Sequence, residues 1–95
     1  MQNYAYPIDP DWTTEEIVVV VELFSAVEQA YEGGVPLAKF QTLYQQFKQI
    51  VTSIGEEKRL DRHFQAASGY SLYRVVKLMK ERQAQAGKQQ DLLKL

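Results

Sequence analysis

The sequence predicts an all-α fold: a compact bundle of four main helices with an extended N-terminal strap and a frayed C-terminal tail. Apolar residues recur with a period near 3.6, and Ser or Thr precedes Glu by three residues at two helix starts. A chain of 95 residues with 45% hydrophobic content has enough apolar side chains for one core. We therefore expect a single helical domain over residues 1–86 and a flexible C-terminal tail over residues 87–95.

Residues 1–12 are expected to form the extended strap. Pro7 and Pro10 fix their own backbone angles and disfavour helix in the residues before them. Burial of large apolar side chains is favourable, so the strap is expected to pack across the bundle. Its apolar residues are Tyr4, Tyr6, Ile8 and Trp12.

The first helix is expected over residues 14–32. Thr13 and Glu16 have the spacing of a capping box, and Trp12 stands where a hydrophobic staple begins. The run Val18–Val21 favours a strand by local propensity, but apolar residues fill an arc of roughly 220° on a helical wheel. Such a wide arc predicts a central, most buried helix. We expect it to end at the pair Gly33 and Gly34, where a left-handed C-cap has no steric cost.

Three more helices are expected, near residues 36–51, 54–68 and 72–86. Pro36 suits the first position of a helix, and Ser53 with Glu56 forms a second capping sequence. The third helix has a short apolar stripe and should lie at the periphery; the stripe is Leu60, Phe64 and Ala67. Gly69 is the expected C-cap before the fourth helix, and Ser71 its N-cap.

The sequence lacks the residues that several classes of protein function require. The chain has no cysteine, which excludes disulfides and thiolate chemistry and fits a reducing compartment, so we expect a cytoplasmic protein. No signal sequence, membrane span, phosphate-binding loop or nucleophile elbow occurs. Asp9 and Asp11 fit helix-end electrostatics better than a metal site, and the lone His63 fits a structural role. We predict no catalytic residue, metal, cofactor, membrane contact or small-molecule ligand.

Charge divides the sequence into two parts. Every charged residue up to position 38 is acidic, whereas all eleven Lys and Arg residues follow it. Helical phase places basic side chains on exposed faces of the third and fourth helices, opposite their apolar stripes. Such faces attract acidic surfaces on a partner or on a second copy. The candidate partner-binding residues are Arg59, Arg62, Tyr73, Arg74 and Lys77.

The segment 66–75 also resembles the turn of a helix-turn-helix, in which a glycine precedes a recognition helix. Gln65 stands where a small residue usually packs, and the net charge of −1 differs from the basic charge of nucleic-acid-binding domains. We therefore expect a protein-interaction or regulatory module, with an unidentified protein partner or self-association. Weak nucleic-acid binding by the third and fourth helices is the alternative, and an enzyme with an unrecognised site is a third hypothesis.

Several short segments resemble a family of small bacterial proteins. The string Tyr6–Asp9 followed by Asp11–Ile17, and later Ser68–Ser71, resemble uncharacterised protein family 0223 in order and spacing. The likeness covers about residues 4–80. It implies an all-helical cytoplasmic bundle of low-GC Gram-positive bacteria, with no assigned activity, cofactor or catalytic residue. Val35 departs from the pattern, because an Asp-type cap is expected before the second helix.

Overall fold

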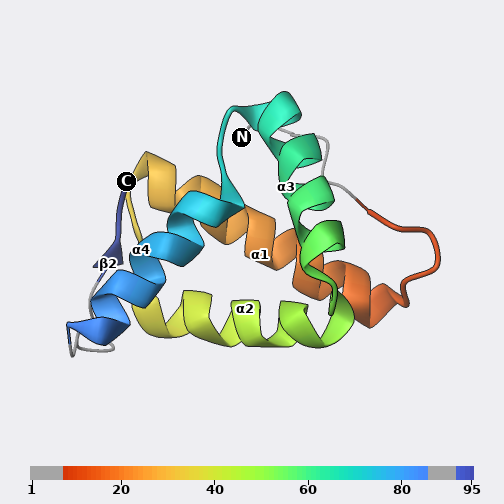
Figure 1. The fold of residues 1–95 in the computed structure, drawn as a ribbon, viewed down its shortest axis with the longest axis horizontal. Coiled ribbons are helices and arrows are strands. Elements are labelled where there is room, and N and C mark those ends of the chain that lie inside the picture. Colours follow the sequence, from red (N-terminus) through yellow and green to blue (C-terminus); the bar gives the residue numbers. More distant parts are fainter. Residues whose placement is uncertain (1–7, 86–91) are drawn as a thin grey trace.

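A computed structural model describes residues 8–85 and 92–95, and within these residues the fold is all-α apart from one short strand pair (Figure 1). The predicted fold class is confirmed. Three of the four expected helices match within one residue at each end, and the fourth ends two residues early because Gln85 already leaves the helical conformation. The elements are α1 (Thr14–Glu32), β1 (Val35–Pro36), α2 (Leu37–Ile50), α3 (Ile54–Ser68), α4 (Leu72–Ala84) and β2 (Leu92–Leu93).

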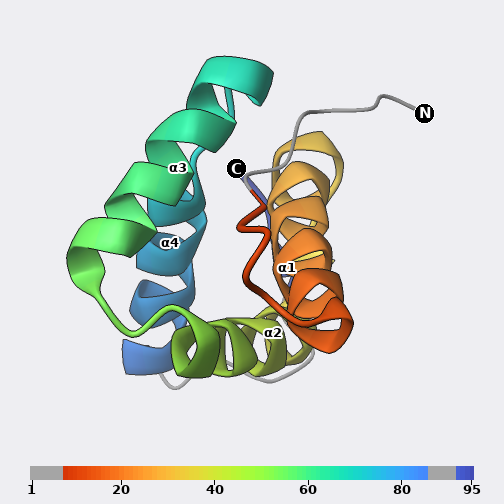
Figure 2. The same cartoon turned by 90° about the vertical axis from the view of Figure 1, so that its right-hand side faces the viewer.

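Helix α1 lies on one side of the molecule, α3 and α4 lie on the other, and α2 crosses the base (Figure 2). The predicted capping box is present: the Thr13 hydroxyl accepts a hydrogen bond from the Glu16 N–H at 3.1 Å, and the Glu16 carboxylate accepts one from the Thr13 N–H at 2.9 Å. The Val18–Val21 run is helical. Six buried residues make α1 the most buried helix, as predicted: Val20, Leu23, Phe24, Ala26, Val27 and Ala30.

Aromatic rings join three helices in the core. The Phe24 ring of α1 lies 4.6 Å from that of Phe64 on α3 and 6.2 Å from that of Phe47 on α2, measured between centroids. All three side chains are fully buried. Helix α3 contributes few other buried residues and is peripheral as expected, but Ala67 is exposed and does not belong to its stripe.

The N-terminal strap differs from its prediction where it is described. Residues 9–12 form a turn, since the Trp12 N–H donates to the Asp9 carbonyl at 3.1 Å and the Asp11 N–H to the Asp9 carboxylate at 2.9 Å. An Asp side chain that accepts from the backbone two residues on favours such a turn over extended chain. Trp12 is half-buried against the core, whereas Ile8 is exposed. Residues 1–7 of the expected strap lie outside the described residues.

The C-terminal tail also corrects the sequence prediction. Residues 92–95 are not frayed: β2 pairs antiparallel with β1, with Val35 opposite Leu93, and both side chains are fully buried. The Leu95 N–H donates to the carbonyl of Ala30 at 2.8 Å. This pairing accounts for Val35 before α2, because the position is a core residue of a strand. Pro36 is accordingly the N-cap of α2 and not its first helical residue.

The left-handed residue of the turn after α1 is Gly34, the second glycine of the expected pair. Gly33 has an extended backbone with φ of 176°, and Gly34 takes φ of 120°, which residues with a side chain rarely adopt. A Cβ at Gly34 would also lie 3.5 Å from the Leu92 side chain. At the corner between α3 and α4 the prediction holds, because Gly69 has φ of 81° and caps α3.

Candidate partner-binding groove

An open cavity of about 730 Å³ lies where α2, α3 and α4 meet. Helix α3 rises from the end of α2, and α4 runs back toward the beginning of α2, so the three helices surround it (Figure 1). We call it the lysine groove. It is lined by Tyr44, Lys48, Ile54, Glu57, Lys58, Asp61, Leu72, Tyr73, Val76, Lys77, Lys80, Glu81 and Ala84.

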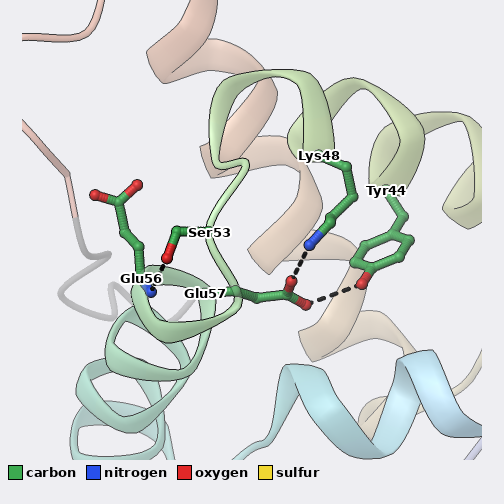
Figure 3. Close-up of polar contacts among 5 residues, drawn as sticks. All are labelled: Tyr44, Lys48, Ser53, Glu56 and Glu57. Carbon is green, nitrogen blue, oxygen red and sulfur yellow. Dashed lines mark hydrogen bonds and ion pairs between the residues drawn. The ribbon is translucent and has the colours of Figure 1, made fainter.

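A polar network joins α2 to α3 at the floor of the groove (Figure 3). The Glu57 carboxylate accepts a hydrogen bond from the Tyr44 hydroxyl at 2.9 Å and forms an ion pair with the Lys48 Nζ at 2.6 Å. Burial raises the pKa of the Tyr44 hydroxyl, and the hydrogen bond to Glu57 and its negative charge raise that pKa further. The hydroxyl therefore stays protonated as a donor, and the charge of Glu57 is compensated by Lys48.

A second carboxylate in the groove, that of Asp61 on α3, caps the neighbouring helix α4. It accepts hydrogen bonds from the Leu72 N–H at 2.8 Å, the Tyr73 N–H at 3.1 Å and the Ser71 hydroxyl at 3.2 Å. The side chain of Ser71, the predicted N-cap, accepts from the Arg74 N–H at 3.4 Å. Asp61 is only 9% exposed, so the α4 N-terminus supplies the donors and positive potential that compensate its burial.

The walls of the groove carry exposed apolar side chains. Ile54 at the start of α3 is 67% exposed, and Tyr73 on α4 is 65% exposed. Leu72 and Val76, both buried in the core, line the same groove. Two large apolar side chains that face water beside a cavity are typical of a binding surface.

The rim of the groove is basic. Lys58 on α3 and Lys77 and Lys80 on α4 line it, and none forms an ion pair with a carboxylate of the described residues. Lys77 and Lys80 are three residues apart and therefore lie on one face of α4. Glu81 is the acidic side chain of the rim that lies beside them.

The structure brings some of the candidate residues together and separates others. Tyr73 and Lys77 line the groove. A guanidinium nitrogen of Arg59 lies 3.8 Å from a carboxylate oxygen of Glu56 on the same helix, and the Arg59 side chain is exposed. Arg62 and Arg74 are exposed but do not line the groove.

No three His, Asp or Glu side chains in residues 8–85 and 92–95 are grouped so that they could hold a metal ion. His63 is exposed on α3 and does not line the groove. In the same part of the chain, no helix is both long and apolar enough to cross a bilayer.

The comparisons with known proteins agree with the segments noted in the sequence. A family model described as "Uncharacterised protein family (UPF0223)" matches residues 3–88. The chain belongs to this family. It is similar to the UPF0223 protein of Enterococcus faecalis, with 60% identity over 81 residues, 85% of this chain and 88% of the relative. It is also similar to UPF0223 proteins of Listeria welshimeri and Listeria monocytogenes, each 49% identical over 78 residues, 82% of this chain and 87% of the relative.

The UPF0223 match includes every residue that lines the lysine groove and ends before β2. The candidate residues named from the sequence include Tyr73 and Lys77 but not the polar and apolar lining residues Tyr44, Lys48, Ile54, Glu57 and Asp61. Asp61 had a signal, because it is a charged residue beside the buried stripe of Leu60 and Phe64, shortly before the N-terminus of the next helix. The contact of Glu57 with α2 had no such signal.

Proposed function

We propose that this UPF0223 protein is a small cytoplasmic interaction or regulatory module that binds a protein partner in the lysine groove and catalyses no reaction. The observation that carries the proposal is the pair of exposed side chains, Ile54 on α3 and Tyr73 on α4, that line one open cavity. Exposure of large apolar groups to water is unfavourable in the free protein, and a partner that covers them removes this cost. Tyrosine is also enriched at the centres of protein interfaces.

The polar groups of the groove support binding rather than catalysis. The Tyr44 hydroxyl has a raised pKa and already donates to Glu57, so it is a poor base or nucleophile at neutral pH. Next to the lining residue Leu72, the Ser71 hydroxyl donates to the Asp61 carboxylate and accepts from the Arg74 N–H, so it serves as a helix cap. These groups hold α2, α3 and α4 in place around the groove.

Weak nucleic-acid binding remains a second candidate function. It is supported by the left-handed Gly69 at the corner between α3 and α4 and by the exposed Arg62 and Arg74 outside the groove. Phosphate contacts would make such binding fall steeply with salt concentration. Binding to short DNA and RNA duplexes and single strands at low salt tests it, and its absence in all of them excludes this function.

Capture from a native lysate tests the proposed module. The wild-type protein should retain one or more proteins that Tyr73→Ala and Lys77→Glu release, while an exposed α1 variant, Glu22→Gln, should retain them. Both groove substitutions are at exposed positions, so circular dichroism should show an unchanged helical fold. Equal retention by the wild type and both groove variants would refute a partner site in the groove.

A further inference from the structure

We infer that the segment bound in the lysine groove is an acidic amphipathic helix, whose apolar face covers Ile54 and Tyr73 and whose carboxylates pair with Lys58, Lys77 and Lys80. The inference rests on the proposed function and specifies the chemistry of the partner. It follows from the shape of the groove, from its charges and from the backbone of the elements that line it.

The shape of the groove fits side chains of a helix. A volume of about 730 Å³ lies within the range of roughly 300–1,000 Å³ that binding pockets occupy. Ile54 and Tyr73 come from two different helices, and the buried Leu72 and Val76 also line the groove. An amphipathic helix presents apolar residues at positions i, i+3, i+4 and i+7, and such a row is the usual occupant of a groove between helices.

The charges of the groove select an acidic partner. Two carboxylates that line it are already engaged, Glu57 by Lys48 and Asp61 by the N-terminus of α4. The lining residues that remain carry three positive charges, on Lys58, Lys77 and Lys80, and one negative charge, on Glu81. None of the three lysines pairs with a carboxylate of the described residues. Both α3 and α4 therefore contribute unpaired positive charge to the groove, Lys58 from α3 and Lys77 and Lys80 from α4. Acidic residues that flank an apolar row would meet both.

The backbone around the groove disfavours an extended peptide. All lining residues belong to the helices α2, α3 and α4, and the N–H groups of Leu72 and Tyr73 at the start of α4 already bond to Asp61. A bound strand needs a free sheet edge to pair with, and the groove has none in its lining. Nucleic acid would pair with the lysines through phosphate but would leave Ile54 without a matching apolar surface.

A second copy of the chain is also a poor match. Helix α1 carries five glutamates and no basic residue, but its apolar face is already buried in its own core. Within Thr14–Glu32, Val18 is the one large apolar side chain that is exposed, at 47%. One such residue does not form the apolar row that the groove requires.

Selection from a displayed library of helix-forming 18-residue peptides tests the inference. The immobilised wild-type protein should enrich peptides with an apolar row flanked by Asp and Glu. The tightest peptide, labelled for fluorescence anisotropy, should lose about tenfold or more in affinity with Tyr73→Ala or Lys77→Glu, a change typical of interface hot spots. Arg62→Glu is the matched control, because it reverses a charge on α3 outside the groove and should change the affinity less than about twofold.

The outcomes separate the two proposals. Enrichment of basic or uncharged peptides at the groove, or affinities that Tyr73→Ala and Lys77→Glu leave unchanged, would overturn the acidic helix. If no peptide binds the groove while a lysate protein does so in a Tyr73-dependent manner, the helix is wrong and the interaction module stands. Dimerisation by sedimentation that Lys77→Glu abolishes would identify a second copy as the occupant and also overturn the inference.

Discussion

Substitution of Asp61 tests how much the hydrogen bonds between α3 and α4 contribute to the stability of the fold. Substitution of Asp61 by Ala removes the acceptor for two backbone N–H groups and one hydroxyl, and it leaves the Leu72 N–H in a buried place without its partner. A hydrogen bond to a charged group contributes about 1.5–3 kcal/mol, and leaving a buried donor unsatisfied costs about 1–3 kcal/mol.

The three bonds do not add, because they share one carboxylate and the Tyr73 N–H lies beside an exposed side chain. We therefore expect Asp61→Ala to lower the free energy of unfolding by about 2–4 kcal/mol. Asp61→Asn keeps a hydrogen-bond acceptor but loses the negative charge at the N-terminus of α4. We expect it to lower the free energy of unfolding by about 1–2 kcal/mol. Because α4 carries Tyr73 and Lys77, both variants should also weaken binding in the groove.

Urea denaturation followed by circular dichroism measures these losses. Glu22→Ala is the control, since it removes an exposed carboxylate from α1 and should change stability by less than about 0.5 kcal/mol. A loss below about 0.5 kcal/mol for Asp61→Ala would refute the interhelical cap, because the loss of two buried hydrogen bonds and one part-buried hydrogen bond to a carboxylate is expected to cost more than that.

The other predictions concern the remaining contacts. Leu93→Ala should lower the free energy of unfolding by about 2–4 kcal/mol, whereas Leu92→Ala, at the exposed neighbour, should cost less than about 1 kcal/mol; equal losses in urea would contradict the pairing of β2. The raised pKa of Tyr44 favours its neutral form in the folded state, so its contribution is complete below about pH 10 and is lost as the pH rises toward the raised pKa. Unfolding at stepped pH should therefore show a steeper alkaline loss of stability for the wild type than for Tyr44→Phe, and equal slopes would refute this. Trp12→Ala should cost about 1–3 kcal/mol because the indole is half-buried against the core, and an unchanged urea midpoint would contradict that contact.

The helices could be predicted because their signals are local. Thr13 with Glu16, Ser53 and Ser71 each act within one turn of the helix that they cap, and they appear in the structure where the sequence places them. The helical period of the apolar residues around Val18–Val21 favoured a helix over a strand. The wide apolar arc of this helix predicted that several neighbouring elements cover it.

The missed features depend on contacts between distant residues. Leu93 stands in a polar segment, and its burial follows from pairing with Val35, which no local pattern reveals. The lysine groove likewise needs the relative placement of three helices. Helical phase correctly put Lys77 on an exposed face, but it could not tell that Lys77 borders a cavity while Arg74 does not.

The pairing of β2 with β1 also bears on the order in which the molecule folds. The groove is built from one continuous stretch between residues 44 and 84, whereas β2 closes a loop back to residue 35. Contacts between residues far apart in the sequence have a higher cost in chain entropy and tend to form late. Helices α2, α3 and α4 can therefore assemble before Leu93 is buried. A chain at that stage would present the lysine groove, the proposed partner site, before its core is complete. Partner binding would then favour the folded helices during synthesis, and the N–H of Leu95 would be among the last to gain protection from hydrogen exchange.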